Sequence, residues 1–472
     1  MTMRHQILLR FPIPLRFTIL LRFAFLLLTG CFAAGAARAQ YGPDIAARAS
    51  FENPSPWSVH FQLTAVDMGH FAFPAKYTGP NSMVDTPEHN VTSLTTSFFL
   101  GRKLWKGAAV YFNPEVSGGR GLSHATGMAG FPNGETFRIG DPSPAVYTAR
   151  LFLQQNIPLG HTGYIVQEDD VNQVRDSIPI QRLTLSAGKF SLDDFFDDNQ
   201  FSHDARGQFL NWSLMSNGAW DYPANTRGYT VGLVAELFLK GFAVRGSIAQ
   251  EPRQANGPDM DQDIFKYHGL SLEAEKPIHI GGQQGTIRLL GFFNATRAIA
   301  YSQVLQEVKE GDSSNVGVFS GATLSHEQGN KYGWGLSANQ NITDNVGVFV
   351  RASWNDGKTG TWAFTEIDQS ASAGIQFLGK LWKRPYDVVG GAYVVNGISS
   401  GHQAYLKAGL TGFMLGDGNL NYGHEGVMEV YYLARLFPHV FLSADYQWAH
   451  NPGYNRDRGP VNIYAFRGHI EF

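Results

Sequence analysis

The C-terminal stretch of the chain decides the fold: Val461-Asn462-Ile463-Tyr464-Ala465-Phe466-Arg467-Gly468-His469-Ile470-Glu471-Phe472. Its side chains alternate with the period of two that is typical of a β-strand. From Tyr464 to Phe472 the even-numbered positions are aromatic, aliphatic or glycine, whereas Arg467, His469 and Glu471 are polar. One face therefore suits lipid and the other suits water, as in an outer-membrane β-barrel. A half-buried strand of a soluble β-sandwich has the same pattern, so this strand alone leaves both folds open.

The same alternation recurs along the chain in segments of about ten residues, which Gly, Pro, Asn and Asp separate. We count sixteen segments, near residues 58–66, 91–101, 108–116, 146–157, 181–190, 227–239, 241–250, 267–276, 285–295, 332–340, 346–354, 369–379, 387–395, 428–436, 442–448 and 461–472. Weaker candidates at 207–215 and 404–414 would raise the count to eighteen. We therefore expect an all-β fold, a transmembrane antiparallel β-barrel of 16 strands (18 possible) of the outer-membrane porin type. A barrel that wide has a water-filled lumen.

Composition agrees with a barrel. The chain has 53 glycines, 34 phenylalanines, 19 tyrosines and 9 tryptophans, and 16% of its residues are charged. After residue 39 we find no apolar run of about 18 residues, so no transmembrane helix is expected. Short connections such as 341–345 and 437–439 are expected to be periplasmic turns, and the long ones at 117–144, 191–226, 251–266 and 296–331 extracellular loops.

The N-terminus predicts export. Residues 1–39 have the features of a signal peptide: four arginines, an apolar run from Phe23 to Thr29, and Ala37-Arg38-Ala39 as a cleavage site. We assign residues 40–57 to a short extension and 58–472 to the barrel. Leu28-Thr29-Gly30-Cys31 also resembles a lipobox, which leaves lipidation of Cys31 as an alternative. The protein is thus expected in the outer membrane after cleavage of its signal peptide.

The charge balance argues against nucleic acid as a partner. Five of the 37 basic residues lie in the predicted signal peptide, which leaves 32 against 40 acidic residues. A protein that neutralises phosphates needs a basic excess. The sequence also lacks a nucleophile elbow, a Walker loop, a paired-cysteine zinc site and a His-Glu-x-x-His helix, so no enzyme, cofactor or metal is predicted. A hydrolase site assembled across strands would leave no motif, and a barrel hydrolase therefore stays an alternative.

Charged residues that interrupt the apolar alternation are the main candidates for solute contact, because a charge at mid-depth of the lipid face costs about 2–4 kcal/mol. They are expected to point into the lumen. Mixed signs offer paired donors and acceptors, which suit a neutral polyhydroxylated solute. Pairing with one another to brace the wall is the alternative. The candidates are Arg150, Arg182, Glu236, Arg245, Glu273, Arg288, Arg351, Glu429, Arg435 and Asp445.

Aromatic side chains can bind the C–H faces of sugars. Trp212 and Trp220 lie in the polar region 191–226, away from the positions of a lipid-facing aromatic girdle, and are the candidate platforms. The same region contains four acidic residues between Asp193 and Asp198. They could hold calcium through oxygen ligands, or they could form a solvated loop tip paired with Arg206.

Five stretches of the chain resemble motifs of carbohydrate-selective porins of the OprB type. One runs from Leu415 to Glu425 and continues in Glu429-Val430-Tyr431-Tyr432. The second is Asn451-Pro452-Gly453-Tyr454-Asn455, which leads into the terminal strand. Central matches are Gly188-Lys189-Phe190, Phe196-Asp197-Asp198-Asn199 and Asp221 to Gly228.

The resemblance covers residues 180 to 472. It implies a barrel of about sixteen strands that passes mono- or short saccharides by passive diffusion, without energy coupling. It also implies folding by the barrel assembly machinery in outer-membrane lipid. Phe472 is then the assembly signal of the closing strand. A barrel that displays surface polysaccharide without transporting it is the remaining alternative.

Overall fold

The computed structural model describes residues 55–136, 143–325 and 327–472. Residues Pro56–Phe472 form one compact unit. The predicted signal peptide, Cys31 and most of the predicted extension lie outside the described residues. The barrel strands are β1 (Trp57–His70), β2 (Glu88–Trp105), β3 (Ala108–Gly119), β4 (Ala145–Pro158), β7 (Arg182–Phe190), β8 (Thr230–Leu239), β9 (Phe242–Gln250), β10 (His268–Ile280), β11 (Gln283–Thr296), β12 (Gly329–Thr343), β13 (Val346–Asn355), β14 (Gln369–Leu378), β15 (Val388–Gly397), β16 (Glu425–Phe437), β17 (Val440–His450) and β18 (Val461–Glu471).

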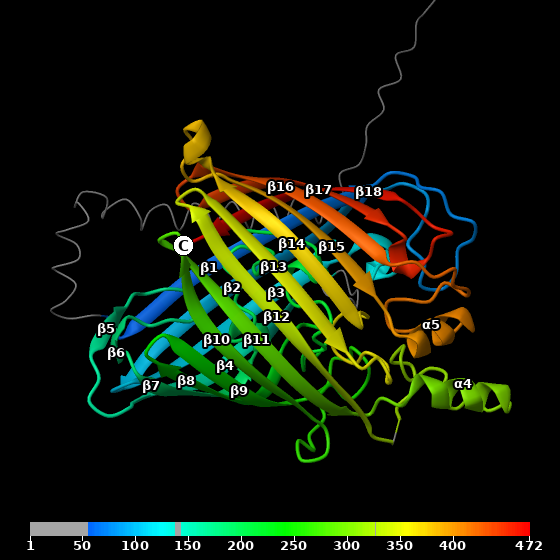
Figure 1. Cartoon of the computed structure of the whole chain (residues 1–472), viewed down its shortest axis with the longest axis horizontal. Helices are drawn as coiled ribbons and strands as arrows, with labels where there is room; N and C mark the ends of the chain where they lie inside the picture. Colours follow the sequence, from blue (N-terminus) through cyan, green and yellow to red (C-terminus); the bar gives the residue numbers. More distant parts are fainter. Residues whose placement is uncertain (1–54, 137–142, 326) are drawn as a thin grey trace, which may run out of the picture. The chain divides into compact units, whose positions relative to one another are not determined.

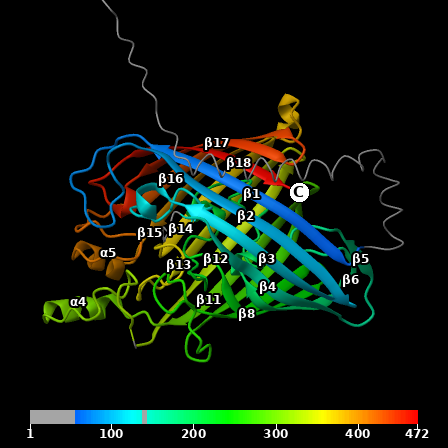
Figure 2. The ribbon, with the colours of Figure 1, turned by 180° about the vertical axis from the view of Figure 1, so that it is seen from behind.

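These sixteen strands form one closed antiparallel barrel (Figures 1 and 2). Each strand pairs with its neighbours in the chain order of the barrel, and β18 closes the ring on β1, with Leu63 opposite Ile470. Phe472 continues this pairing, since its N–H donates to the carbonyl of Phe61 at 2.9 Å. The predicted count of sixteen is confirmed. Closure gives every strand two partners, as a bilayer requires.

The two weaker strand candidates are wrong, because their backbones are capped as helices. Segment 404–414 begins in α5 (Ser400–Lys407), where the Ser399 side chain accepts from the N–H of His402. Segment 207–215 ends in the short α3 (Trp212–Met215), where the Asn211 side chain accepts from the N–H of Ser213. A side-chain acceptor at the N-cap binds backbone N–H groups of the first helical turn. In a strand these N–H groups would pair with the neighbouring strand.

The two ends of the barrel differ. At the end that carries Phe472, most connections are tight turns, such as Gly281-Gly282, where both residues have positive φ (61° and 80°) as a two-residue hairpin requires. One connection at this end is longer and contains the separate hairpin β5 (Tyr164–Gln167) and β6 (Asp176–Pro179). The other end has the long loops, α5 and α4 (Tyr301–Lys309) (Figure 1). Short turns are typical of the periplasmic end.

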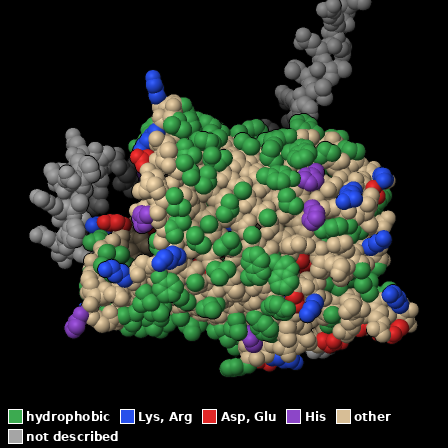
Figure 3. All heavy atoms as spheres, viewed as in Figure 1, with side chains coloured by type: hydrophobic (Ala, Val, Ile, Leu, Met, Phe, Trp, Pro, Cys, Tyr) green, Lys and Arg blue, Asp and Glu red, His purple; other side chains and the backbone are tan. Residues whose placement is uncertain are grey.

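The outer and inner faces follow the predicted alternation. On β10, Leu270 and Leu272 are 40% and 61% exposed, whereas Ser271 and Glu273 are buried. Hydrophobic side chains are spread over the outer strand surface, and charged side chains gather mainly toward the two ends (Figure 3). Among the described residues, no helix has the length and apolarity needed to cross a membrane.

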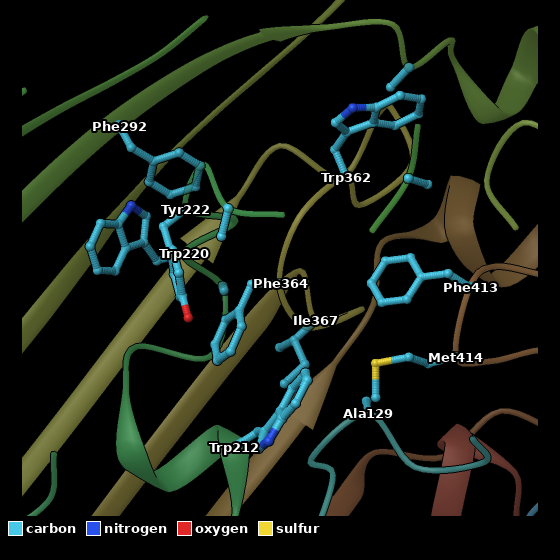
Figure 4. Close-up of a cluster of buried hydrophobic side chains, with 14 of the residues drawn as sticks. Ala129, Trp212, Trp220, Tyr222, Phe292, Trp362, Phe364, Ile367, Phe413 and Met414 are labelled. Atoms are coloured by element: carbon cyan, nitrogen blue, oxygen red, sulfur yellow. The ribbon is translucent and has the colours of Figure 1, made fainter. Parts of the chain in front are cut away.

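The lumen is largely filled. Buried side chains of the wall, such as Tyr111 and Leu290, belong to the same hydrophobic cluster as Trp212, Trp220 and Phe364 of the loops. Figure 4 shows the aromatic part of this cluster. The long loops therefore fold inward, and they leave much less open space than a simple wide tube would.

Candidate functional site

The connection between β7 and β8, residues 191–229, crosses the lumen, and we call it the lumen loop. It is bonded to strands all around the barrel, which only a segment inside the ring can reach. Its Arg206 donates to Gln62 of β1 at 2.6 Å, and its Leu210 N–H donates to Glu429 of β16 at 2.6 Å. The carbonyl of Phe201 accepts from the Gln376 amide of β14 at 2.9 Å. The loop narrows the channel.

Carboxylates on the wall hold the backbone of the lumen loop. Glu429 accepts from the N–H groups of Leu210 and Asn211, at 2.6 and 3.0 Å. Glu273 accepts from the N–H of Asp197 at 2.8 Å. A buried backbone N–H without a partner costs about 1–3 kcal/mol. The wall thus supplies acceptors to N–H groups of the loop that no strand pairing satisfies.

Arginines of the wall also hold the lumen loop. Arg351 donates through Nε to Asp197 at 3.0 Å, and through Nη1 to the carbonyl of Leu214 at 2.7 Å. Arg150 donates through Nε to Asp194 at 2.7 Å. Both aspartates belong to the acidic run that the sequence marked at 193–198. These contacts are the wall bracing that we considered as the alternative to solute contact.

Between the lumen loop and strands β2 to β4 lies a cavity of about 130 Å³. A single water molecule needs only about 10–15 Å³, so the cavity can hold a small solute. It is lined by residues of three kinds: acids (Glu115, Glu135), arginines (Arg206, Arg227) and aromatics (Tyr147, Trp212, Tyr222, Tyr229, Phe364), together with small polar side chains. This cavity is the candidate functional site.

Glu115 of β3 organises the polar side of the cavity. The hydroxyls of Ser97 and Tyr147 donate to it in short contacts, and the hydroxyl of Tyr229 donates at 3.1 Å. The guanidinium of Arg206 lies 3.5 Å from its carboxylate and 3.1 Å from that of Glu135. A buried carboxylate needs such partners, and this network fixes the positions of the donors that face the cavity.

Two stacked pairs of side chains also border the cavity. The guanidinium carbon of Arg227 lies 4.1 Å from the ring centre of Tyr147, and its Nη1 donates to Ser117 at 3.1 Å. On the opposite side Trp212 is nearly parallel to Phe364, with 5.4 Å between ring centres and 12° between planes. The Trp212 N–H donates to the carbonyl of Asn133 at 2.9 Å, which fixes the indole.

Burial alone would lower the pKa of Arg206, but the charges of Glu135 and Glu115 raise it, so the guanidinium stays charged. Burial and the charge of Glu115 raise the pKa of Tyr229 well above its usual value, so its hydroxyl stays a donor. The polar side of the cavity therefore keeps its hydrogen-bonding character over the physiological pH range.

The structure places the predicted residues in three groups. Trp212 lines the cavity, whereas Trp220 is fully buried between Phe196 and Tyr222. The residues that are bonded to the lumen loop are Arg150, Glu273, Arg351 and Glu429. The remaining candidates lie elsewhere on the wall: Arg182, Glu236, Arg245, Arg288, Arg435 and Asp445.

Each residue of that last group has a partner, but only Arg245 and Glu236 pair with each other. Arg245 lies 3.4 Å from Glu236 and 2.5 Å from Glu273, and Arg288 lies 3.0 Å from Glu275. Arg182 lies over the ring of Phe238, and Arg435 over that of Tyr386. Asp445 accepts from Gln447 at 3.4 Å. Solute contact by any of these residues stays a prediction.

Several cavity residues were missed. Glu115 and Tyr147 lie on inward positions of predicted strands, so the criterion of inward polar residues could have found them. Arg206 belongs to the lumen loop, and Arg227 is separated from β8 by two residues. Period-two alternation reports only the wall, and the wall pattern therefore gives no signal for the loop residues that complete the cavity.

The acidic run does not form a ligand cluster. In the part of the chain that the structure describes, no three His, Cys, Asp or Glu side chains are grouped as for a metal ion. Asp194 pairs with Arg150, Asp197 with Arg351, and Asp193 lies 4.0 Å from His203. Arg206 contacts Glu115 and Glu135, and its backbone N–H donates to Asp204.

Comparison with known proteins gives a family and a fold. The family model described as carbohydrate-selective porin, OprB family, matches residues 93–472. No curated protein matches the sequence. Among solved structures, the high-pH structure of Pseudomonas putida OprB is 14% identical, with 90% of this chain and 96% of that chain covered and a TM-score of 0.66. Salmonella typhi OmpF in complex with daunomycin is 8% identical, with 88% and 97% covered and a TM-score of 0.47. The first similarity supports the sixteen-stranded fold.

Proposed function

The chain belongs to the OprB family of carbohydrate-selective porins and forms an outer-membrane channel for carbohydrates, and from this premise we propose how the channel selects its solute. A mono- or short saccharide diffuses passively through the lumen and binds transiently in the cavity beside the lumen loop. Arg206, Arg227, Tyr147 and Glu115 meet its hydroxyls, and Trp212 meets a C–H face.

The observation that carries this proposal is the composition of the cavity. A neutral sugar presents donors and acceptors around its rim and apolar C–H groups on its faces. The cavity offers two guanidinium groups and a carboxylate network on one side and the Trp212–Phe364 stack on the other. A pore that selects ions carries lining charges of one sign. The charges that line this cavity are of both signs. The site therefore fits a polyhydroxylated neutral solute.

Family members and structural neighbours are channels rather than enzymes. Among the residues that the structure describes, no contact favours a hydrolase or a barrel that only displays polysaccharide. Passive transport also needs no energy-coupling partner. We further propose that outer-membrane lipid surrounds the apolar outer face and that the barrel assembly machinery recognises Phe472. Deleting Phe472 should lower the amount of inserted protein without changing its sugar selectivity, and normal membrane levels would contradict that role.

The transport proposal can be tested in planar bilayers. The purified barrel should conduct ions, and adding glucose or maltose should reduce the conductance in a saturable way. Arg227→Gln should weaken this block about tenfold, because a hydrogen bond from a charged donor contributes about 1.5–3 kcal/mol. Arg435→Gln, which lies away from the cavity over Tyr386, is the matched control. A barrel without conductance, or a conductance that is insensitive to both sugars, would overturn the proposal.

A further inference from the structure

Two turns at the Phe472 end of the barrel repeat one tetrapeptide. Lys103-Leu104-Trp105-Lys106 lies at the turn between β2 and β3, and Lys380-Leu381-Trp382-Lys383 lies at the turn between β14 and β15. In an antiparallel barrel β2, β14 and β18 run in the same direction, so both turns lie at the end where β18 stops (Figures 1 and 2). The channel function uses neither turn.

The apolar members of the repeat are exposed. Trp105 is 57% exposed and Leu381 58%, and the neighbouring Tyr386 is 64% exposed. The indole N–H groups have internal partners: Trp105 donates to Gln155 at 2.8 Å, and Trp382 to Tyr432 at 3.3 Å. The rings are thus fixed against the barrel at its rim. Trp and Tyr at such a rim lie at the level of lipid headgroups.

Cations accompany these rings. Arg102 lies over Trp57 at 4.6 Å, Lys106 is 6.0 Å from the ring centre of Tyr164, and Arg435 lies over Tyr386 at 4.3 Å. The two turns also expose Lys380 and Lys383. Among the ion pairs of the described residues, none includes Lys106, Lys380 or Lys383. Their charges are therefore not neutralised by the protein.

Other residues of the repeat already have acidic partners. Lys103 points inward and pairs with Asp176. Arg384, which follows the second repeat, pairs with Asp387 at 2.6 Å. Within the two repeats the unpaired charge is thus carried by Lys106, Lys380 and Lys383. A turn with positive charge beside exposed apolar and aromatic side chains matches an anion that is itself attached to an apolar chain.

We propose that the two Lys-Leu-Trp-Lys turns bind the phosphate headgroups of anionic glycerophospholipids in the membrane leaflet at the Phe472 end. Each turn places Trp and Leu among the upper acyl carbons and its free lysines at the phosphates. Juxtamembrane lysines are attracted to anionic lipids by such an arrangement. Strands β16 to β18 and β1 separate the two hairpins on one side of the ring. Lipids bound at two places on the rim fix the depth and tilt of the barrel.

The test measures lipid binding to the whole processed barrel by native mass spectrometry in detergent, with phosphatidylglycerol and with phosphatidylcholine. We expect wild type to retain phosphatidylglycerol preferentially. The variant K106Q/K380Q/K383Q should lose about fivefold in affinity for each lysine. The variant K309Q/K358Q/K407Q removes three exposed lysines at the opposite end and is the matched control. Added salt should weaken the preference, and inorganic phosphate should weaken it no more than sodium chloride at the same ionic strength.

Two results would overturn the proposal. The first is equal retention of the two lipids by wild type, and the second is an unchanged preference in K106Q/K380Q/K383Q. If the triple variant does not insert, K106Q and K380Q/K383Q are measured separately, with ion conductance as proof of folding. Each variant should then bind phosphatidylglycerol more weakly than wild type. If both variants keep the wild-type preference for phosphatidylglycerol, the lipid site is contradicted.

Discussion

Two sides of the lumen loop use similar residues for different ends. On the side of β10 to β16, Arg351 and Glu429 are fully engaged with the backbone and with Asp197 of the loop. On the side of β2 to β4, Glu115 and Arg206 also pair, yet they border a cavity of about 130 Å³. The comparison shows two roles for inward-facing charged side chains. Those whose hydrogen bonds all go to the loop hold the loop in place, whereas those that border an open cavity can also contact a solute.

The largest effect on conductance is expected from a substitution on the side of β10 to β16. Arg351→Met would leave the buried Asp197 without its partner, and breaking a buried ion pair costs about 3–5 kcal/mol. The lumen loop should detach, so single-channel conductance should rise and sugar block should weaken together. Arg435→Met is the control and should leave both unchanged. If Arg351→Met conducts like wild type, Arg351 does not hold the loop in place.

A smaller effect is expected from Glu429→Gln. The amide keeps one oxygen acceptor for Leu210 or Asn211 and leaves the other N–H without one, and a buried donor without a partner costs about 1–3 kcal/mol. Limited proteolysis should then cut the lumen loop faster than in wild type. Glu310→Gln, on an exposed position after α4, should not change the rate. Equal cleavage in all three proteins would show that the loop does not depend on this carboxylate.

The cavity side predicts changes in affinity rather than in loop stability. Trp212→Leu removes the ring that stacks on Phe364 at the cavity, and aromatic contacts are worth about 0.5–1.5 kcal/mol beyond burial. The sugar concentration for half-block of the conductance should rise about fivefold. Trp220→Leu, which changes an indole outside the cavity, should lower heat stability and leave that concentration nearly unchanged. The reverse outcome would reassign the platform to Trp220.

The smallest effect concerns pH and the pair Asp193–His203. Burial raises the pKa of Asp193 from 3.8 to about 6. Burial lowers the pKa of His203, but the charges of Asp193, Asp198 and Asp197 raise it above 6.5. Both shifts favour the protonated forms in the folded loop. Asp193 therefore stabilises the folded loop fully below pH 3.8, and this stabilisation is lost as the pH rises through about 6. His203 stabilises the folded loop fully below pH 6.5, and this stabilisation is lost as the pH rises through its raised pKa.

Conductance should accordingly increase slightly across these two windows, as the loop loosens. Asp193→Asn should remove the change in the acidic window, and His203→Gln the change above pH 6.5. Arg351 and Asp194 also face this pair, so their variants should be titrated alongside. A pH profile that neither substitution alters would show that other groups govern the loop.

Period-two alternation predicted the wall correctly, because each inward or outward position depends only on its own strand. The inward direction of Arg351 and Glu429 follows from that local rule. Their bonds to the lumen loop do not, since they join residues far apart in the chain, as Arg351 and Asp197 show. For the same reason Arg206 appeared to pair with acids of its own loop, whereas the closed ring brings Gln62 and Glu115 to it.

The carboxylate and arginine contacts of the lumen loop also set an order of assembly. Glu273, Arg351 and Glu429 lie on β10, β13 and β16, all of which follow the loop in the chain. The loop therefore cannot reach its final position until those strands have joined the sheet and β18 has met β1. The selectivity of the channel therefore depends on strands that the chain supplies only after the loop itself.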